Sequence, residues 1–458
     1  MWDFIEHLFT SVWNRLRDRR VDSGDESSGL SLGFAVTDDG VSSRRQTLGP
    51  AQRATHLAVL GKTGSGKSSL LRHMGREDIR AGRGFIWFDL HGDATPFLLR
   101  AIAERERKQE KHLSDRVILI APGDEEVSVG FNPLEQERQD FVRIAEFAAI
   151  LRARWGLDHF GARTDELLRN SLYVLSANGM TLLELAPLLT HNGFRAASLK
   201  SLPNAEVKQY FETRFDQASD GMRAAMREPI LNKTSAFTAD PHFRHMIGQR
   251  RSTFSMREAM DRGYWVIADL NKGRLGEQAL TVANLLFAVV KGALFTRERR
   301  SLFTIYADEI QNLVASDAGI ETVLSEARKF SVSVVSANQF LDQYPAPMRS
   351  AILAVGTHAF FQLSPSDAAT VAQALDGGRS LAERLKNLPT RHFIVKSGAE
   401  RWKEVAAHDV IDSRMSYADL LVRVRAQCAR PHHEVEREIG ERHATLHKTT
   451  DHALHEWD

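Results

Sequence analysis

The residues with the clearest chemistry form the glycine-rich stretch GKTGSGKSS, from Gly61 to Ser69. The stretch follows the apolar run HLAVL and precedes LLRHMGREDI, so it lies between a predicted strand and a predicted helix. It fits the pattern G-x-x-x-x-G-K-[ST], in which backbone N–H groups and a helix N-terminus cradle phosphates. We expect bound nucleotide to contact this phosphate loop, which comprises Gly61, Lys62, Thr63, Gly64, Ser65, Gly66, Lys67, Ser68 and Ser69.

Two side chains of the phosphate loop have defined chemical roles. Lys67 would reach the β- and γ-phosphates of ATP, and the Ser68 hydroxyl would ligate Mg²⁺. A chance glycine-rich turn is the alternative, but the strand, the helix, the lysine and the serine all stand in the required order. The predicted cofactors are therefore ATP and Mg²⁺.

An acidic pair, Asp308 and Glu309, ends the apolar strand pattern LFTIYADE. Beside a phosphate loop, one carboxylate can hold Mg²⁺ and a second can take a proton from the attacking water. We therefore assign Asp308 to magnesium and Glu309 to the general base. A solvated loop start is the alternative for such a pair taken alone.

Two further candidates follow the acidic pair. Gln339 closes the next predicted strand, VSVVSAN, so we expect it at the same sheet edge as Lys67 and Asp308, where a γ-phosphate sensor would sit. Arg328 lies between these strands, and in a ring of identical subunits it could reach a neighbour's phosphate as an arginine finger. An ordinary polar strand end and a solvated helix face are the alternatives for these two residues.

The strands that would position these residues fall into two groups. Residues 30–132 contain HLAVL, GFIWFD and RVILIA, and residues 263–412 contain YWVIADL, LFTIYADE, VSVVSAN, HAFFQL and HFIVK. Strands that alternate with helices predict an α/β core with a parallel-rich sheet. Residues 133–262 show helical spacing, which predicts an all-α insertion. An amphipathic helix with a polar linker is predicted for residues 1–29, and a charged helical tail for residues 413–458.

Composition limits the class of protein. The 458 residues, 43% of them hydrophobic and 26% charged, are typical of a globular protein with two or three domains. With 60 Lys and Arg residues against 59 Asp and Glu residues, the net charge is +1, so any DNA contact must be local. The single cysteine excludes an intramolecular disulfide and a cysteine-rich metal site. We find no secretory signal and no apolar run of about 20 residues, which predicts a cytoplasmic protein.

The first 20 residues carry an apolar helical stripe that must rest on another surface. One interpretation is docking on the protein's own core or on a sister subunit. The other is a partner protein, or a peripheral position at the inner face of a membrane. The stripe consists of Trp2, Ile5, Phe9, Val12, Trp13 and Leu16.

The ordered set of motifs resembles the TraD-like conjugative coupling ATPases, the type IV secretion DNA-binding ATPases, within the HerA/FtsK class. The matching stretches, between residues 32 and 396, are GKTGSGKSSLL, GFIWFDLHGD, VGFNPL, ADLNKGRLGE, YADEIQNL and EARKFSVSVVSANQFLDQ. The resemblance implies a RecA-like P-loop core and a homo-oligomer, expected to be a hexamer, that moves DNA through its channel. It also implies nucleotide and magnesium contacts at Lys67 and Ser68, a Walker B pair at Asp308 and Glu309, a finger at Arg328 and a sensor at Gln339.

We therefore predict an ATP-driven DNA translocase that acts in conjugative or mobile-element transfer or in DNA processing on single- or double-stranded DNA. Membrane-bound coupling proteins carry N-terminal transmembrane helices, whereas this sequence starts with an amphipathic helix. The alternative is a soluble ATPase that docks and hands over protein substrates, or serves a partner nuclease, in a defence or secretion system. A nucleotide-gated scaffold without turnover is disfavoured because such a protein has no need of a general base.

Overall fold

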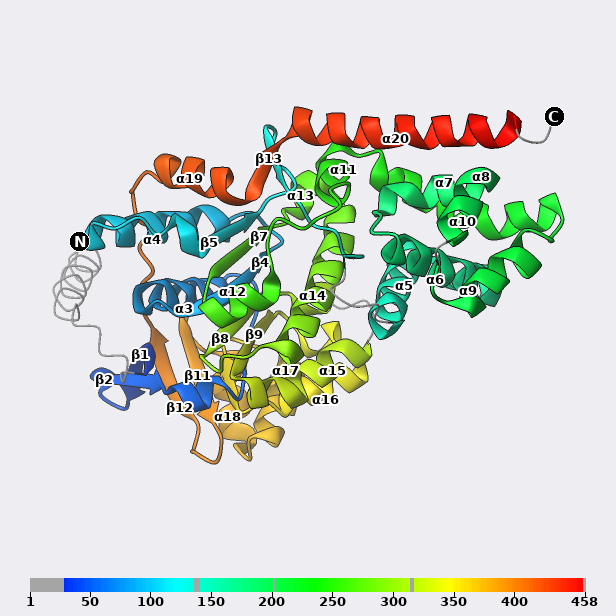
Figure 1. The fold of residues 1–458 in the computed structure, drawn as a ribbon. Helices are drawn as coiled ribbons and strands as arrows, with labels where there is room; N and C mark the ends of the chain where they lie inside the picture. The colour runs from blue at the N-terminus through cyan, green and yellow to red at the C-terminus, as the bar shows by residue number, and fades with distance from the viewer. Residues whose placement is uncertain (1–28, 136–140, 201, 314–316, 456–458) are drawn as a thin grey trace.

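The computed structural model describes residues 29–135, 141–200, 202–313 and 317–455 (Figure 1). The predicted first helix lies outside these residues. A mixed sheet of 11 strands forms the centre, in the order β2-β1-β12-β11-β10-β3-β9-β8-β4-β7-β5. Its strands are β1 (Leu30–Thr37), β2 (Gly40–Leu48), β3 (Leu57–Leu60), β4 (Gly84–Asp89), β5 (Val117–Ile120), β7 (Trp265–Asp269), β8 (Phe303–Asp308), β9 (Val332–Asn338), β10 (Thr357–Phe360), β11 (His392–Ser397) and β12 (Lys403–Ala407).

The strands from β10 to β5 in this order run parallel to one another. Beyond β10 the sheet continues antiparallel through β11, β12, β1 and β2. The parallel strands are apolar runs because helices cover both of their faces. The predicted α/β fold with a parallel-rich sheet is thus confirmed. The antiparallel strands β1, β2 and β12 are an addition that the sequence analysis missed.

Alternate residues of each strand join different hydrophobic clusters on the two faces of the sheet. In β4, Phe85 and Trp87 pack with α3 and α4, whereas Ile86 and Phe88 pack with α14. The buried layers therefore hold the carboxyl ends of the parallel strands along a common edge. The helices of this α/β part are α2 (Pro50–Arg53), α3 (Lys67–Ala81), α4 (Ala94–Gln109), α13 (Lys272–Leu275), α14 (Gln278–Thr296), α15 (Asp317–Glu326), α16 (Ala346–Leu353), α17 (Pro365–Ala374) and α18 (Gly378–Lys386).

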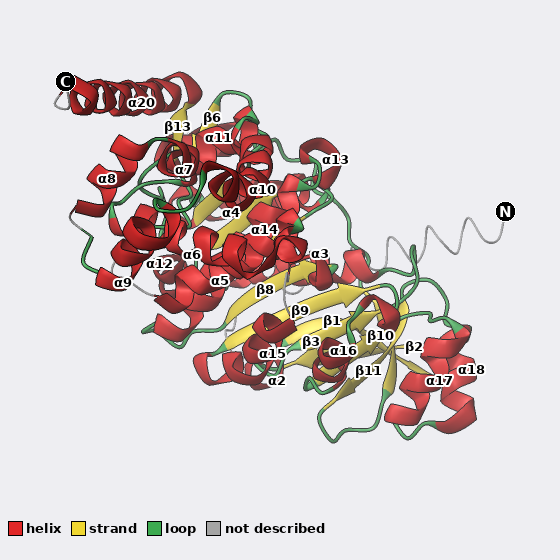
Figure 2. Ribbon diagram, turned by 90° about the vertical axis from the view of Figure 1, so that its right-hand side faces the viewer, coloured by secondary structure: helices red, strands yellow, loops and turns green. Residues whose placement is uncertain are grey.

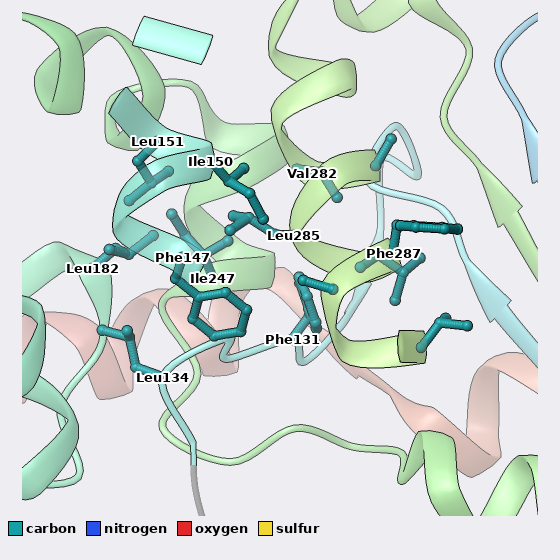
Figure 3. Close-up of a cluster of buried hydrophobic side chains, with 14 of the residues drawn as sticks. Phe131, Leu134, Phe147, Ile150, Leu151, Leu182, Ile247, Val282, Leu285 and Phe287 are labelled. Atoms are coloured by element: carbon teal, nitrogen blue, oxygen red, sulfur yellow. The ribbon is translucent and has the colours of Figure 1, made fainter. Parts of the chain in front are cut away.

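Helices predominate in the described residues from 141 to 262, which we call the helical segment. Figure 1 and Figure 2 show α5 to α10 gathered at one end of the molecule, whereas α12 packs against α14 and β4. The segment shares one hydrophobic cluster with α14, as the side chains of Phe147, Ile150 and Leu285 show in Figure 3. The helical segment therefore shares one continuous hydrophobic core with the α/β part. Its helices are α5 (Phe141–Trp155), α6 (Gly161–Ala177), α7 (Leu185–Thr190), α8 (Asn192–Lys200), α9 (Ala205–Gln209), α10 (Asp220–Thr238), α11 (Pro241–Ile247) and α12 (Met256–Arg262).

The C-terminal residues 418–455 pack against both the α/β part and the helical segment. After α19 (Ala418–Cys428), the short strand β13 (Ala429–Pro431) pairs antiparallel with β6 (Val127–Val129), and α20 (His432–His455) follows. Figure 1 shows α20 running from the sheet towards the helical segment. Arg442 on α20 lies 3.3 Å from Glu184, and Ile439 is fully buried against Leu183. The tail therefore ties the α/β part to the helical segment.

Among the described helices, α14 is long and apolar enough to cross a membrane, but 72% of its apolar window is buried inside the protein. It packs against α5 and α12. Its apolar composition is accounted for by this place in the core. The location of the protein in the cell stays a prediction.

Candidate nucleotide site

The phosphate loop joins β3 to α3. Gly64 and Gly66 have φ values of 75° and 119°, in the region that favours glycine. A Cβ atom on Gly61 would lie 2.5 Å from the Cβ atom of Phe361, which packs directly beneath the loop. The Gly61 N–H donates to the Asn338 carbonyl oxygen at 3.2 Å, which fixes the start of the loop to the end of β9. Glycine is therefore required both for the turn and for its close approach to the sheet.

Lys67, the first residue of α3, has a buried side chain. Its Nζ atom donates to the carbonyl oxygens of Gly61 and Lys62, at 2.6 and 3.1 Å. Burial lowers the pKa of Lys67, and the nearby Asp308 and Glu309 carboxylates oppose this shift. The ammonium group is thus held within the curve of the phosphate loop.

Ser68 and Asp308, the predicted magnesium ligands, lie together. The Ser68 hydroxyl donates to Asp308 Oδ2 at 3.1 Å across the carboxyl edge of the sheet. Burial raises the pKa of Asp308, while the Ser68 hydrogen bond and the Lys67 charge lower it. Mg²⁺ prefers oxygen ligands and is commonly bound by one or two carboxylates together with substrate phosphates and water. One hydroxyl and one carboxylate beside a phosphate loop fit that donor set.

Glu309 has a φ of 58°, in the left-handed region that non-glycine residues rarely adopt. Its N–H donates to the Ala337 carbonyl oxygen at 2.7 Å. Its carboxylate accepts from Asn312 Nδ2 at 3.0 Å and from Gln339 Nε2 at 3.5 Å. His91 Nε2 lies 4.0 Å from Glu309 Oε2. Side chains from three separate segments of the chain therefore surround this carboxylate.

Gln339 connects the phosphate loop to Glu309. Thr63 Oγ1 donates to Gln339 Oε1 at 3.0 Å, and Gln339 Nε2 faces Glu309 on its other side. Because β3, β9 and β8 are neighbours in the sheet, their carboxyl ends bring Thr63, Gln339 and Glu309 to one edge. The side-chain amide is thus placed between the phosphate loop and the acidic pair.

Arg328 lies away from this group. It belongs to a short 3-10 helix, Ala327–Phe330, that precedes β9, so it lies at the opposite, amino edge of the sheet. The nearby His56 is buried, which lowers its pKa to about 4, and the Arg328 charge adds to that effect. The Arg328 side chain is exposed, and no other described residue forms a hydrogen bond or ion pair with it. Its assignment as a finger for a neighbouring subunit stays a prediction.

Four residues that shape the site were not predicted from the sequence. Asn312 and His91 face Glu309, and Phe361 supports Gly61. Arg391 donates its backbone N–H to the Ser65 carbonyl oxygen at 2.8 Å. Asn312 stands within YADEIQNL, three residues after Glu309, the predicted general base, and this proximity was an available signal. The other contacts join distant parts of the chain and leave no local pattern.

Comparison with known proteins agrees with this geometry. Residues 52–155 match the family described as helicase HerA, central domain (DUF87). Over those residues the chain is similar to the HerA central domain. No curated protein sequence matches it.

Solved structures extend the likeness beyond that domain. The conjugative coupling protein TrwB is 16% identical, with a TM-score of 0.55, over 84% of this chain and 91% of that one. TrwB in complex with ADP and Mg²⁺ is 17% identical, with a TM-score of 0.55 and the same coverage. VirB4 of Thermoanaerobacter pseudethanolicus is 15% identical, with a TM-score of 0.55, over 84% of this chain and 98% of that one.

At these identities the structural likeness shows the fold, so the predicted RecA-like P-loop core is confirmed. The match of residues 52–155 to the HerA central domain confirms the resemblance to the HerA/FtsK class. TrwB has been solved in complex with ADP and Mg²⁺ and with a non-hydrolysable ATP analogue. These ligands of TrwB, together with the HerA domain match, agree with the expected ATPase class and with ATP and Mg²⁺ as its cofactors.

Proposed function

We propose that this chain is an ATP-driven DNA translocase that works as a ring of identical subunits, with six as the expected number. The observation that carries the proposal is the group of residues at the carboxyl edge of the sheet. Lys67, Ser68 and Asp308 lie there beside Glu309 and Gln339, within a HerA-type P-loop core. This group contains both a place for phosphates and the carboxylate that hydrolysis requires.

The residues divide the work of hydrolysis between them. Lys67 and the N–H groups of the phosphate loop bind the β- and γ-phosphates, and Ser68 and Asp308 would hold Mg²⁺. When bound, the ion would supply positive charge to offset the charge developing on the phosphates. Glu309 accepts a proton from the attacking water at its carboxylate, while Gln339 orients that water from between Thr63 and Glu309.

Arg328 would complete the site of the adjacent subunit. It is exposed at the amino edge of the sheet, remote from its own subunit's phosphate loop. An arginine supplied from a neighbour stabilises the transition-state charge and couples hydrolysis to ring assembly. Sequential hydrolysis around the ring would then move loops that contact the DNA backbone.

Turnover in the presence of DNA tests the DNA part of the proposal. The ATPase rate of the full chain is measured with no DNA, with single-stranded DNA and with double-stranded DNA, at rising salt concentration. We expect DNA to stimulate turnover and salt to weaken the stimulation, because phosphate contacts release counterions. An active enzyme that responds to neither DNA would contradict DNA translocation while leaving the ATPase assignment intact.

Hand-over of protein substrates is the second candidate function. The net charge of +1 is the observation that favours it, since this balance supplies no general attraction for nucleic acid. In that case a protein partner would stimulate hydrolysis and DNA would not. The same assay, with candidate partner proteins added in place of DNA, separates the two functions.

A further inference from the structure

A path of hydrogen bonds joins the helical segment to the acidic pair. Arg154 lies in the last turn of α5, and its Nη2 atom donates to the Asn312 carbonyl oxygen at 2.6 Å. Asn284 on α14 donates its Nδ2 atom to the same oxygen at 2.8 Å. Two donors from two helices therefore hold a single carbonyl group. A hydrogen bond from a guanidinium is stronger than one between neutral groups.

Asn312 makes the last step to Glu309. Its backbone N–H donates to the Glu309 carbonyl oxygen at 2.9 Å, and its Nδ2 atom donates to Glu309 Oε2 at 3.0 Å. The carbonyl of Asn312 is thus fixed from the helices, while its side chain fixes the carboxylate. A shift of Asn312 would change the direction in which Glu309 presents its oxygen atoms.

Packing makes this path stiff. Ile310 and Leu313 are the first and last residues of the short 3-10 helix that carries Asn312. They are 0% and 1% exposed and belong to the hydrophobic cluster shared by α5 and α14. Figure 3 shows α5 facing α14 across this cluster through Phe147, Ile150 and Leu285. Close-packed interiors transmit displacements because there is little free volume to absorb them. Movement of α5 would therefore carry the Asn312 carbonyl with it.

We propose that Arg154 is a positioning residue: it holds Asn312 so that the Asn312 amide orients Glu309, and the helical segment thereby sets the rate of ATP hydrolysis. The inference rests on the proposed role of Glu309 as general base. It makes the helical segment a control element for the catalytic site, since whatever displaces α5 changes the orientation of the base. Arg154 itself touches neither nucleotide nor water in this mechanism.

Steady-state kinetics of the full chain test the proposal. Arg154→Met removes every donor and keeps an apolar stem, and Asn312→Ala removes the amide and keeps the backbone carbonyl. Arg152→Met is the matched control, because Arg152 lies on the same helix and pairs with Asp165 at 3.2 Å. We expect kcat to fall about 10-fold or more in the first two variants, since small errors of orientation are costly in catalysis. The KM for ATP and nucleotide binding should change little, because the phosphate loop is untouched.

A double-mutant cycle separates positioning from general destabilisation. If Arg154 acts through the Asn312 amide, the double variant should be no slower than Asn312→Ala alone. Additive losses, an unchanged kcat in Arg154→Met, or an equal loss in Arg152→Met would each overturn the inference. Glu309→Gln is measured alongside. If that variant keeps full turnover, the proposed function of Glu309 fails as well, whereas an inactive Glu309→Gln with an unaffected Arg154→Met refutes only the path.

Discussion

The buried carboxylate of Asp78 offers a sharp test of how the core supports the site. Asp78 lies on α3, the helix that follows the phosphate loop, and is 0% exposed. Its carboxylate accepts hydrogen bonds from residues of α2, of β8 and of the turn before β4. Its hydrogen-bond donors are Arg53 Nη1 and Nη2, each at 2.7 Å, Arg83 Nε at 2.8 Å and Tyr306 Oη at 2.7 Å.

Asp78→Asn removes the negative charge and keeps the shape of the side chain. Arg53, only 3% exposed, would then hold an uncompensated buried charge. Removal of one partner from a buried ion pair costs about 3–5 kcal/mol, so we expect the free energy of unfolding in urea to fall by that amount. Asp412→Asn is the control. Both oxygen atoms of Asp412 accept hydrogen bonds from Arg100, here from Nε and Nη2, but Asp412 is 50% exposed, so its loss should cost less than about 1 kcal/mol.

The pH dependence of this difference is also fixed by the structure. Burial alone would raise the pKa of Asp78, but the charges of Arg53 and Arg83 outweigh it and hold the pKa below its usual value. The stabilisation is therefore fully present above the unfolded-state pKa of about 4, and it is lost as the pH falls through the folded-state pKa. The difference in the free energy of unfolding between the wild type and Asp78→Asn should be constant from about pH 7 to 5 and should become smaller below about pH 4. Equal free energies of unfolding for the two proteins at pH 7 would show that the Asp78 charge does not stabilise the core.

Three further predictions concern the site. Gly61→Ala places a Cβ atom 2.5 Å from that of Phe361, so ATP affinity measured by calorimetry should fall at least about 10-fold; unchanged affinity would contradict the close approach. Gln339→Ala should lower kcat by about 10- to 100-fold with a smaller change in KM, and a change confined to KM would contradict its role in orienting water. Arg328→Ala should be inactive alone but regain ATP turnover when mixed with Lys67→Ala. In a mixed ring, some sites combine an intact Lys67 from one subunit with an intact Arg328 from its neighbour. No recovery of turnover would contradict an arginine finger shared between subunits.

The fold was predictable from the sequence where buried elements have a clear apolar pattern. The strands β3, β4, β8 and β9 are apolar runs because both of their faces are covered. By contrast, β2 has the sequence GVSSRRQTL and exposes most of its residues at the sheet edge. The pairing of β1 with β12, which aligns Gly33 with Ala407, depends on tertiary contact between the two ends of the core. Local patterns do not encode such pairing.

The candidate site likewise contains residues that were predictable from the sequence and contacts that were not. Lys67, Ser68, Asp308 and Glu309 were predictable because their chemistry follows from short motifs at the ends of strands. The contact of Arg154 with Asn312 was not predictable, because it joins the end of α5 to a short 3-10 helix 158 positions further along the chain. An arginine at a helix C-terminus is ordinarily explained by the helix dipole alone. Its second role emerges only when the packing of α5 against α14 is known.

The most direct test of the central claim is ATP turnover by the full chain and by Glu309→Gln, with Mg²⁺ present and nucleotide binding measured in parallel. We expect the variant to bind ATP as the wild type does and to hydrolyse it at least about 100-fold more slowly, since a general base contributes about that factor or more. A variant that binds ATP and hydrolyses it at the wild-type rate would contradict the claim that this sheet edge is the hydrolytic site.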